Sequence, residues 1–191
     1  MDHRLCLSVE MPEDMVALGQ CAGKVLFDGA VIGLSGALGA GKTTLARGIA
    51  EGMGIDEEYV VSSPTYTILQ TYPCRGRLLH HLDLYRITSR EDLDSTGYRD
   101  SFGGHMVLLI EWPEREPSVL PPENLVIRID YQEVGRRVAF VPSGGLYDEL
   151  AKRVVDAYRR NRSTRGHGDT LRPNSGQAET RGEELVHEDV D

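Results

Sequence analysis

Residues 31 to 44 read Val-Ile-Gly-Leu-Ser-Gly-Ala-Leu-Gly-Ala-Gly-Lys-Thr-Thr, and this stretch decides the fold. From Gly36 to Thr43 it matches the phosphate-binding P-loop pattern G-x-x-x-x-G-K-[ST]. Glycines let backbone N–H groups turn inward around phosphate oxygens, and the positive end of the helix that follows favours the same anion. The stretch therefore predicts a nucleotide-phosphate site between a strand and a helix.

Every residue of this loop is a candidate contact to the nucleotide, namely Gly36, Ala37, Leu38, Gly39, Ala40, Gly41, Lys42, Thr43 and Thr44. Lys42 is expected to act in catalysis by reaching the β- and γ-phosphates of ATP, and the hydroxyl of Thr43 is expected to bind Mg²⁺. The alternative is a glycine-rich turn with a solvated lysine. The helical spacing of Leu45, Ile49 and Met53 after the loop favours the phosphate site.

Composition limits the class of protein. The chain has 191 residues, of which 40% are hydrophobic, enough for one ordinary domain with a sizeable core. Its formal net charge of −9 argues against direct binding to nucleic-acid phosphates, so any role near RNA is expected to pass through a partner. No long apolar run or signal-peptide pattern occurs, and three widely spaced cysteines are typical of reduced thiols. We therefore expect a cytoplasmic protein that does not enter membranes.

The order of apolar runs predicts an α/β protein with the three-layer P-loop NTPase fold: a mostly parallel central sheet, antiparallel additions and flanking helices. Strands are expected at residues 5–9, 30–34, 66–72, 78–84, 106–110, 124–131 and 137–141, with a turn at 73–77. One helix is expected from Pro12 to Phe27, and a second is expected to follow the P-loop and end at Gly52 or Gly54. A short third helix is expected after Ser89, which is predicted to cap its N-terminus. Leu146, Leu150, Val154 and Tyr158 predict a terminal docking helix.

We expect a single ATPase domain over residues 1–160, followed by a tail over residues 161–191. The tail carries almost no large apolar side chains and has no periodic pattern. Such a segment buries too little surface to offset the entropy lost on ordering, so an acidic disordered tail is predicted.

The rest of the site is expected where neighbouring strands end. Glu111 directly follows the apolar run Met106–Ile110, the position at which a P-loop protein needs an acidic Mg²⁺ ligand. Trp112, the only tryptophan, is a candidate wall of the nucleotide pocket, although a plain core or rim aromatic fits equally well. Thr65 follows Ser63 and Pro64 in a loop of the kind that senses a γ-phosphate.

Three other patterns do not predict sites. His80, His81 and Asp83 look like metal ligands, but on a strand His80 points away from the other two. Asp94-Ser-Thr-Gly97 matches a GTPase motif, yet it follows a polar helix and no guanine-reading motif occurs. Leu34-Ser35-Gly36, which matches a transporter-ATPase signature, lies inside the P-loop itself.

Four motifs occur together: Gly-x-Leu-Gly-Ala-Gly-Lys-Thr-Thr (36–44), Ser-Pro-Thr-Tyr (63–66), His-x-Asp-Leu-Tyr-Arg (81–86) and Ile-Glu-Trp-Pro (110–113). In this order they resemble the TsaE family, small bacterial ATPases needed to make threonylcarbamoyladenosine beside the tRNA anticodon. The resemblance covers roughly residues 10 to 142. One departure is Ala37, where the family usually has Asp, and this puts details of nucleotide handling or partner contact in doubt.

The resemblance implies ATP and Mg²⁺ as cofactors, a P-loop α/β fold, and TsaB and TsaD as partners. Those partners carry out the threonylcarbamoyl transfer, tRNA is reached only through their complex, and ATP hydrolysis supports their turnover. The resemblance further implies that Lys42 contacts phosphate and that Thr43 and Glu111 hold Mg²⁺. Asp83 takes the position of an acidic residue important for hydrolysis, and Thr65 takes a switch-like position.

Two other functions fit a P-loop. A small metabolite kinase would need an acceptor pocket and an arginine-rich lid, and no such arginine cluster stands out in the sequence. A nucleotide-sensing adaptor without catalysis would be distinguished by ATPase assays with and without partners.

Overall fold

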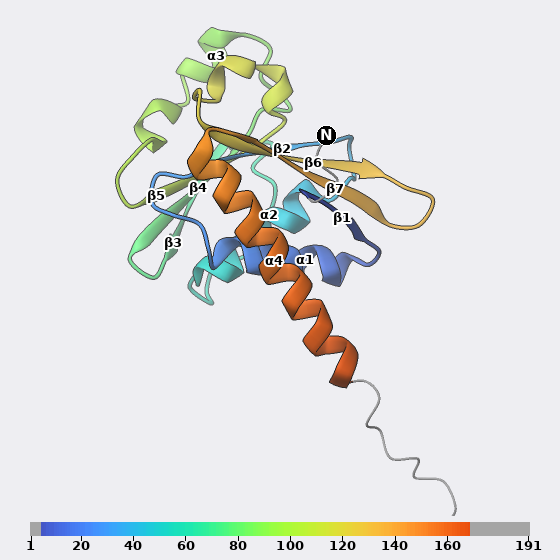
Figure 1. Ribbon diagram of the computed structural model, residues 1–191. Helices are drawn as coiled ribbons and strands as arrows, with labels where there is room; N and C mark the ends of the chain where they lie inside the picture. Colours follow the sequence, from blue (N-terminus) through green and yellow to red (C-terminus); the bar gives the residue numbers. More distant parts are fainter. Residues whose placement is uncertain (1–4, 169–191) are drawn as a thin grey trace, which may run out of the picture.

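The computed structural model describes residues 5–168. It is an α/β fold with one mixed sheet and flanking helices (Figure 1). The strands are β1 Cys6–Val9, β2 Val31–Ser35, β3 Leu69–Cys74, β4 Arg77–Asp83, β5 Met106–Glu111, β6 Asn124–Tyr131 and β7 Arg136–Ser143. The helices are α1 Pro12–Gly23, α2 Lys42–Met53, α3 Arg90–Asp94 and α4 Gly145–Gly168, with short 3₁₀ turns at Tyr98–Ser101, Pro113–Arg115 and Pro117–Val119.

The seven-stranded sheet has the order β1-β7-β6-β2-β5-β4-β3. Its centre is parallel, because β2 pairs in parallel with β6 and β5, and β5 pairs in parallel with β4. The pairings β1–β7, β6–β7 and β3–β4 are antiparallel. The sheet is thus mixed, with the parallel strands gathered at its centre, where the predicted site lies, and antiparallel pairings on both sides of them, as expected.

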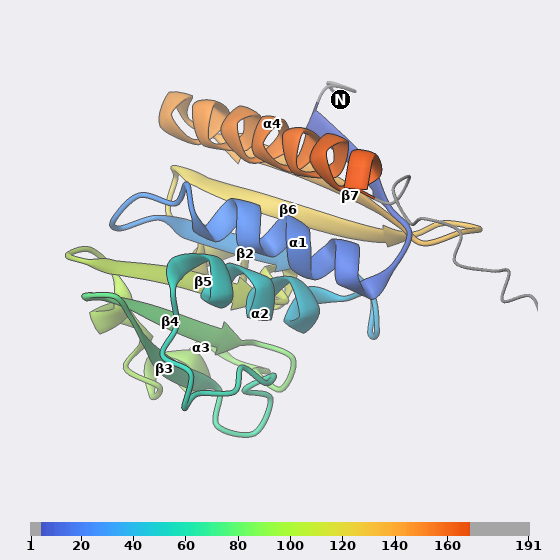
Figure 2. The ribbon, with the colours of Figure 1, turned by 90° about the horizontal axis from the view of Figure 1, so that it is seen from below.

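Side-chain alternation along the central strands divides the core into two parts. Ile32 and Leu109 face the larger cluster, under α1, α2 and α4, which lie side by side on one face of the sheet (Figure 2). Val31 and Leu108 face the smaller cluster, with Leu93 of α3 and the 3₁₀ turns on the other face. Strands covered on both faces are apolar at consecutive positions, which explains the unbroken apolar runs in the sequence.

Helices α1 and α2 touch through their backbones. A Cβ atom at Gly19 would lie 2.5 Å from the carbonyl oxygen of Leu45, and one at Gly48 would lie 2.3 Å from that of Val16. Glycine at both positions permits this close approach. The contact fixes α2, whose first turn carries Lys42, against the rest of the fold.

Helix α1 and strand β3 differ from their predicted bounds by several residues. Helix α1 ends at Gly23 rather than Phe27, and beyond it the N–H groups of both Val25 and Leu26 donate to the same carbonyl, that of Ala22. Strand β3 begins at Leu69 rather than Tyr66. The residue before it, Ile68, has a left-handed backbone with φ 64°, which closes a turn and delays the strand.

The turn predicted at residues 73–77 is shorter than expected. Pro73 lies inside β3, and only Arg75 and Gly76 connect β3 to β4, with φ values of 47° and 81°. β3 is the edge strand of the sheet. Proline is tolerated there because an edge strand does not need every N–H for pairing.

The terminal helix is present, but one residue of its predicted apolar face is wrong. Leu146 is 57% exposed, whereas its neighbour Tyr147 is buried, and the Tyr147 hydroxyl accepts a hydrogen bond from the backbone N–H of Val31 at 2.9 Å. Leu150, Val154 and Tyr158 are buried as predicted. The first residue of the helical stripe is therefore Tyr147.

Helix α4 continues through residue 161 to Gly168, so the prediction that the tail starts at residue 161 is wrong for residues 161–168, which are helical. The prediction of disorder for residues 169–191 lies outside the described residues. Within residues 5–168, no helix is long and apolar enough to cross a membrane.

Candidate functional site

The glycine-rich loop, residues 36–41, joins the carboxyl end of β2 to the first turn of α2. A Cβ atom at Gly36 would lie 2.4 Å from the carbonyl oxygen of Ile129 on β6, so only glycine fits beside that strand. Gly41, the residue that caps α2, has φ 112°, which side chains rarely allow. These two positions explain why the loop needs glycine at its beginning and end.

Lys42 is held on the inner side of this loop. Its Nζ donates to the carbonyl oxygens of Gly36 at 2.7 Å and Ala37 at 3.0 Å, and it lies 3.6 Å from the ring centroid of Trp112. The residue is 5% exposed. Burial lowers the pKa of Lys42, while the nearby carboxylates of Glu111, Glu114 and Asp83 raise it. The ammonium group is thus placed beside a concave loop that suits an anion.

Glu111 ends strand β5 and is 2% exposed. Its Oε1 accepts a hydrogen bond from the Thr43 hydroxyl at 2.8 Å and another from Nε2 of His81 at 2.9 Å. A carboxylate only accepts, so Nε2 of His81 carries the proton. Nδ1 of His81 has no hydrogen-bond partner within residues 5–168, and the imidazole is completely buried. The three side chains therefore form a buried chain that fixes the orientation of the Glu111 carboxylate.

Asp83 ends strand β4 and is paired in register with Glu111. Its Oδ2 accepts from the hydroxyls of Ser63 and Thr65, each at 2.6 Å, and its Oδ1 accepts from the backbone N–H of Tyr85 at 2.8 Å. The loop that carries Ser63 and Thr65 is thereby held against the edge of the sheet. His80, in contrast, lies on the other face of β4, where Nδ1 is 2.8 Å from the Ser101 hydroxyl.

These groups meet in one cleft of about 360 Å³ at the carboxyl ends of the parallel strands. It is lined by Leu38, Gly39, Gly41, Lys42, Thr43, Thr44, Ser63, Thr65, Asp83, Tyr85, Glu111 and Trp112. Trp112 reaches the cleft from a left-handed backbone with φ 60°, and its ring contacts that of Tyr85, with centroids 5.2 Å apart. Of the predicted nucleotide contacts, Gly36, Ala37 and Ala40 do not line the cleft, and their carbonyls are held by side chains instead.

The residues of the cleft fit Mg²⁺ and a phosphate chain. A carboxylate and a hydroxyl, from Glu111 and Thr43, are the hard oxygen ligands that Mg²⁺ prefers, and they lie side by side. Lys42 and the N-terminus of α2 supply positive charge at the same point. In the described part of the chain, no group of three or more His, Cys, Asp and Glu side chains could hold a metal ion on its own. The donor set thus suits a cation that also has oxygen ligands from a phosphate.

Sequence reasoning missed three members of the site: Ser63, His81 and Tyr85. Ser63 and Tyr85 belong to quoted motifs but had no role assigned to them. His81, interpreted from the sequence only as a residue that resembles a metal ligand, reaches Glu111, two residues beyond its register partner Leu109 on β5. The sequence feature that could have identified His81 is its place two residues before Asp83 on an apolar strand, because alternate residues of a strand lie on the same face.

Comparison with known proteins gives the chain its relatives. The family model of "Threonylcarbamoyl adenosine biosynthesis protein TsaE" matches residues 9–138. Two proteins named tRNA threonylcarbamoyladenosine biosynthesis protein TsaE are similar. The protein of Haemophilus influenzae is 38% identical to this chain, and the match covers 65% of this chain and 75% of the relative. The protein of Treponema pallidum is 41% identical, and the match covers 65% of this chain and 90% of the relative. The crystal structure of Bacillus subtilis YdiB superposes with a TM-score of 0.67 at 30% identity, covering 82% of this chain and 95% of YdiB.

Proposed function

The chain belongs to the TsaE family, and on that premise we propose that it is a P-loop ATPase required for threonylcarbamoyladenosine modification of tRNA. One observation carries the nucleotide part of this proposal. Lys42, Thr43, Glu111 and Asp83 come from three separate elements and meet in a single cleft beside a glycine-rich loop. The four groups have the charges and hydrogen-bonding capacity that a triphosphate with its cation requires.

In this proposal the phosphates of ATP lie over the glycine-rich loop and the N-terminus of α2. Lys42 turns its ammonium from the carbonyls of Gly36 and Ala37 toward the phosphate oxygens, a short move because Nζ already lies at the cleft. Thr43 and Glu111 are proposed to hold Mg²⁺, which when bound neutralises charge that builds up on the phosphates. His81 keeps the Glu111 carboxylate in the orientation that the Thr43 hydroxyl also requires.

Asp83 is proposed to orient the attacking water. Its buried carboxylate lies in the wall of the same cleft and is fixed by the N–H of Tyr85. Thr65 is proposed as the residue that senses the γ-phosphate. Because the Thr65 hydroxyl also bonds Asp83, a phosphate that drew this hydroxyl away would change the contacts of the carboxylate.

The nucleobase is proposed to enter a second, smaller cavity of about 140 Å³. It shares Gly39, Gly41 and Thr44 with the main cleft and extends from the glycine-rich loop toward the segment between β1 and α1. Apolar side chains such as Met15 line it together with backbone and the Arg136 side chain. An apolar slot with a few polar groups beside a phosphate site suits a flat base.

ATP hydrolysis is proposed to reset a partner complex made of TsaB and TsaD in the cytoplasm. The chain carries a formal net charge of −9, so we expect it to reach tRNA only through that complex. Hydrolysis would then be slow in the isolated protein and faster when both partners are present.

The test is formation of the modified adenosine under single- and multiple-turnover conditions, with TsaB, TsaD, tRNA and either wild type or Lys42→Ala. Loss of one preorganised charge at a transition state costs about 10²–10³-fold in rate. The variant should therefore hydrolyse ATP about that much more slowly, and it should allow a first round of transfer but not repeated rounds. If Lys42→Ala supports many rounds as well as wild type does, the reset role is wrong.

A further inference from the structure

The outer side of the glycine-rich loop is held by two residues of the β6–β7 hairpin. Tyr131 and Arg136 are paired across the hairpin where it ends, and both side chains reach the loop. The Tyr131 hydroxyl donates to the carbonyl of Leu38 at 2.9 Å. The Arg136 guanidinium donates from Nε to the carbonyl of Ala40 at 3.1 Å and from Nη2 to that of Gly39 at 3.4 Å.

Together with Lys42, these two residues hold every carbonyl from Gly36 to Ala40. Lys42 donates hydrogen bonds to the carbonyls of Gly36 and Ala37 from the inner side of the loop. Tyr131 and Arg136 of the hairpin donate to the carbonyls of residues 38 to 40 from the outer side. In a trans peptide the N–H of the next residue points opposite to the carbonyl, and the described chain has no cis peptide. Fixing the carbonyls of Leu38 and Ala40 therefore also fixes the N–H directions of Gly39 and Gly41, two residues that line the cleft.

Arg136 is itself fixed on its remaining sides. Its Nη1 donates to the carbonyl of Gly135 at 2.8 Å, and its guanidinium lies 4.1 Å from the ring centroid of Tyr131. Gly135, with φ 76°, abuts the end of β1, since a Cβ there would lie 2.3 Å from the carbonyl oxygen of Val9. A guanidinium that donates from each of its three nitrogens is a rigid support rather than a mobile surface charge.

We propose that Arg136, assisted by Tyr131, is a positioning residue for nucleotide binding. It acts by holding the carbonyls of the glycine-rich loop outward, so that the loop N–H groups face the phosphates before ATP arrives. This inference rests on the proposed function, because it assumes that the cleft binds a nucleotide. Preorganised donors bind more tightly since the loop does not have to be ordered during binding.

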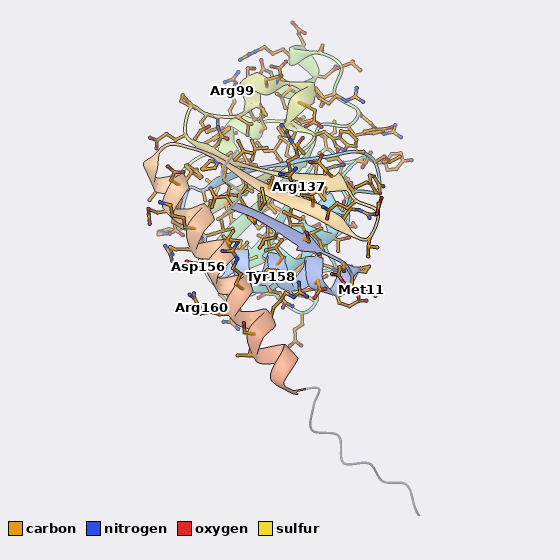
Figure 3. All side chains as sticks on the ribbon, turned by 45° about the vertical axis from the view of Figure 1, so that its right-hand side comes forward. Met11, Arg99, Arg137, Asp156, Tyr158 and Arg160 are labelled. Carbon is orange, nitrogen blue, oxygen red and sulfur yellow. The ribbon has the colours of Figure 1, made fainter. Side chains whose placement is uncertain are left out.

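The test compares Arg136→Met and Tyr131→Phe with the matched control Arg137→Met. Arg137 is the next residue on β7 (Figure 3), and alternation sends its side chain to the other side of the strand, where Nη2 lies 3.7 Å from Sγ of Cys6. Calorimetry with Mg·ATP should give at least about a tenfold weaker Kd for Arg136→Met, as expected for lost charge-assisted hydrogen bonds. Tyr131→Phe should weaken binding by about threefold, in line with one neutral hydrogen bond, and Arg137→Met should bind as wild type does. Tyr131 is 54% exposed, so its variant will fold.

Two further measurements separate positioning from other roles. Mg·tripolyphosphate, which lacks a base and ribose, should also lose affinity in Arg136→Met, because the proposed effect is on the phosphate-binding loop and not only on the cavity proposed for the base. Arg136→Lys keeps the charge without the planar fork and should not restore binding. Without nucleotide, amide exchange should rise in Arg136→Met over residues 36–42 and stay unchanged in the core strands.

The inference is overturned if Arg136→Met binds Mg·ATP within twofold of wild type, if Arg136→Lys restores affinity, or if only ATP and not tripolyphosphate is affected. A failure of the proposed function is a different result, since wild type itself would then bind neither probe.

Discussion

The Thr65 hydroxyl donates a 2.6 Å hydrogen bond to Oδ2 of Asp83, the same oxygen that accepts from the hydroxyl of Ser63. A loop that precedes β3 is thereby attached to the last residue of β4, at the wall of the cleft. The proposed sensor of the γ-phosphate and the proposed water-orienting carboxylate are in direct contact. A change at one of them should therefore be transmitted to the other.

Asp83→Asn should separate hydrolysis from binding. The amide keeps the shape of the side chain but loses the charge, and positioned acid–base groups contribute roughly 10²–10⁴-fold to rates. We expect phosphate release to fall by about 10²-fold or more, while the Kd for Mg·ATP from calorimetry changes by less than about threefold. Equal losses in both quantities would show that Asp83 acts in binding instead.

Glu111 and His81 should act together on the cation. Glu111→Gln should raise the Mg²⁺ concentration needed for ATP binding, because it removes the charged ligand. His81→Phe fills a similar volume but removes the donor to Glu111, so it should shift the Mg²⁺ dependence in the same direction. A hydrogen bond to a charged group contributes about 1.5–3 kcal/mol, and the free energy of unfolding should fall by about that amount.

The control for this pair is His80→Phe, on the opposite face of β4 and bonded to Ser101. Its Mg²⁺ dependence should equal that of wild type, as measured by titration calorimetry at several Mg²⁺ concentrations. If His81→Phe and His80→Phe change the Mg²⁺ dependence of ATP binding equally, the effect comes from any disturbance of β4, and the hydrogen bond from His81 to Glu111 has no specific role.

The backbone contact between α1 and α2 should tolerate no side chain. Gly48→Ala places a Cβ 2.3 Å from the carbonyl oxygen of Val16, so the helices must separate. Overpacking of this kind costs about 1–3 kcal/mol, measured as the free energy of unfolding in urea. Gly145→Ala, at the start of α4 with no atom within 4 Å of the new Cβ, should leave stability unchanged. Equal stabilities of the two variants would contradict the close approach of the helices.

His80 should make stability depend on pH. Burial lowers the pKa of His80 from its ordinary value of 6.5, so the unfolded chain binds this proton at higher pH than the folded chain. The contribution is complete above pH 6.5 and is lost as the pH falls below it, through the folded pKa. His80→Phe should flatten the decrease in melting temperature as the pH begins to fall below about 6.5. An unchanged slope in that variant would assign the decrease to other groups.

The pH range matters because another group acts below it. Hydrogen bonding to His105, with Arg77 nearby, lowers the pKa of Asp28 from its ordinary value of 3.8. Its contribution is therefore present above pH 3.8 and lost only in more acidic solution, outside the range that tests His80.

The parts of the fold that follow from local pattern were predictable. Apolar runs identified β2 and β5, the glycine pattern placed the loop before α2, and Ser89 caps α3 through a bond from the N–H of Asp92 at 3.1 Å. The end of α2 at Met53, followed by Gly54 with φ 80°, also agrees with the sequence. Each of these features depends on residues that are close together in the chain.

Contacts made by register and loop shape were not predictable. His81 meets Glu111 because of the alignment between β4 and β5, which one sequence does not reveal. Arg136 reaches the glycine-rich loop because the hairpin pairs it with Tyr131 and the turn abuts Val9. Leu146 was assigned to the wrong side of α4 since a shift of one residue rotates the apolar stripe by about 100°.

The melting temperature with and without Mg·ATP tests the central claim most directly, with wild type and Lys42→Ala measured side by side. Ligand at 100 times Kd stabilises the folded state by about 2.7 kcal/mol, which corresponds to a rise of about 5–10 °C for a domain of this size. We predict that rise for wild type and a much smaller one for Lys42→Ala at the same concentration. No shift of wild type with either Mg·ATP or Mg·GTP would contradict a nucleotide site in this cleft.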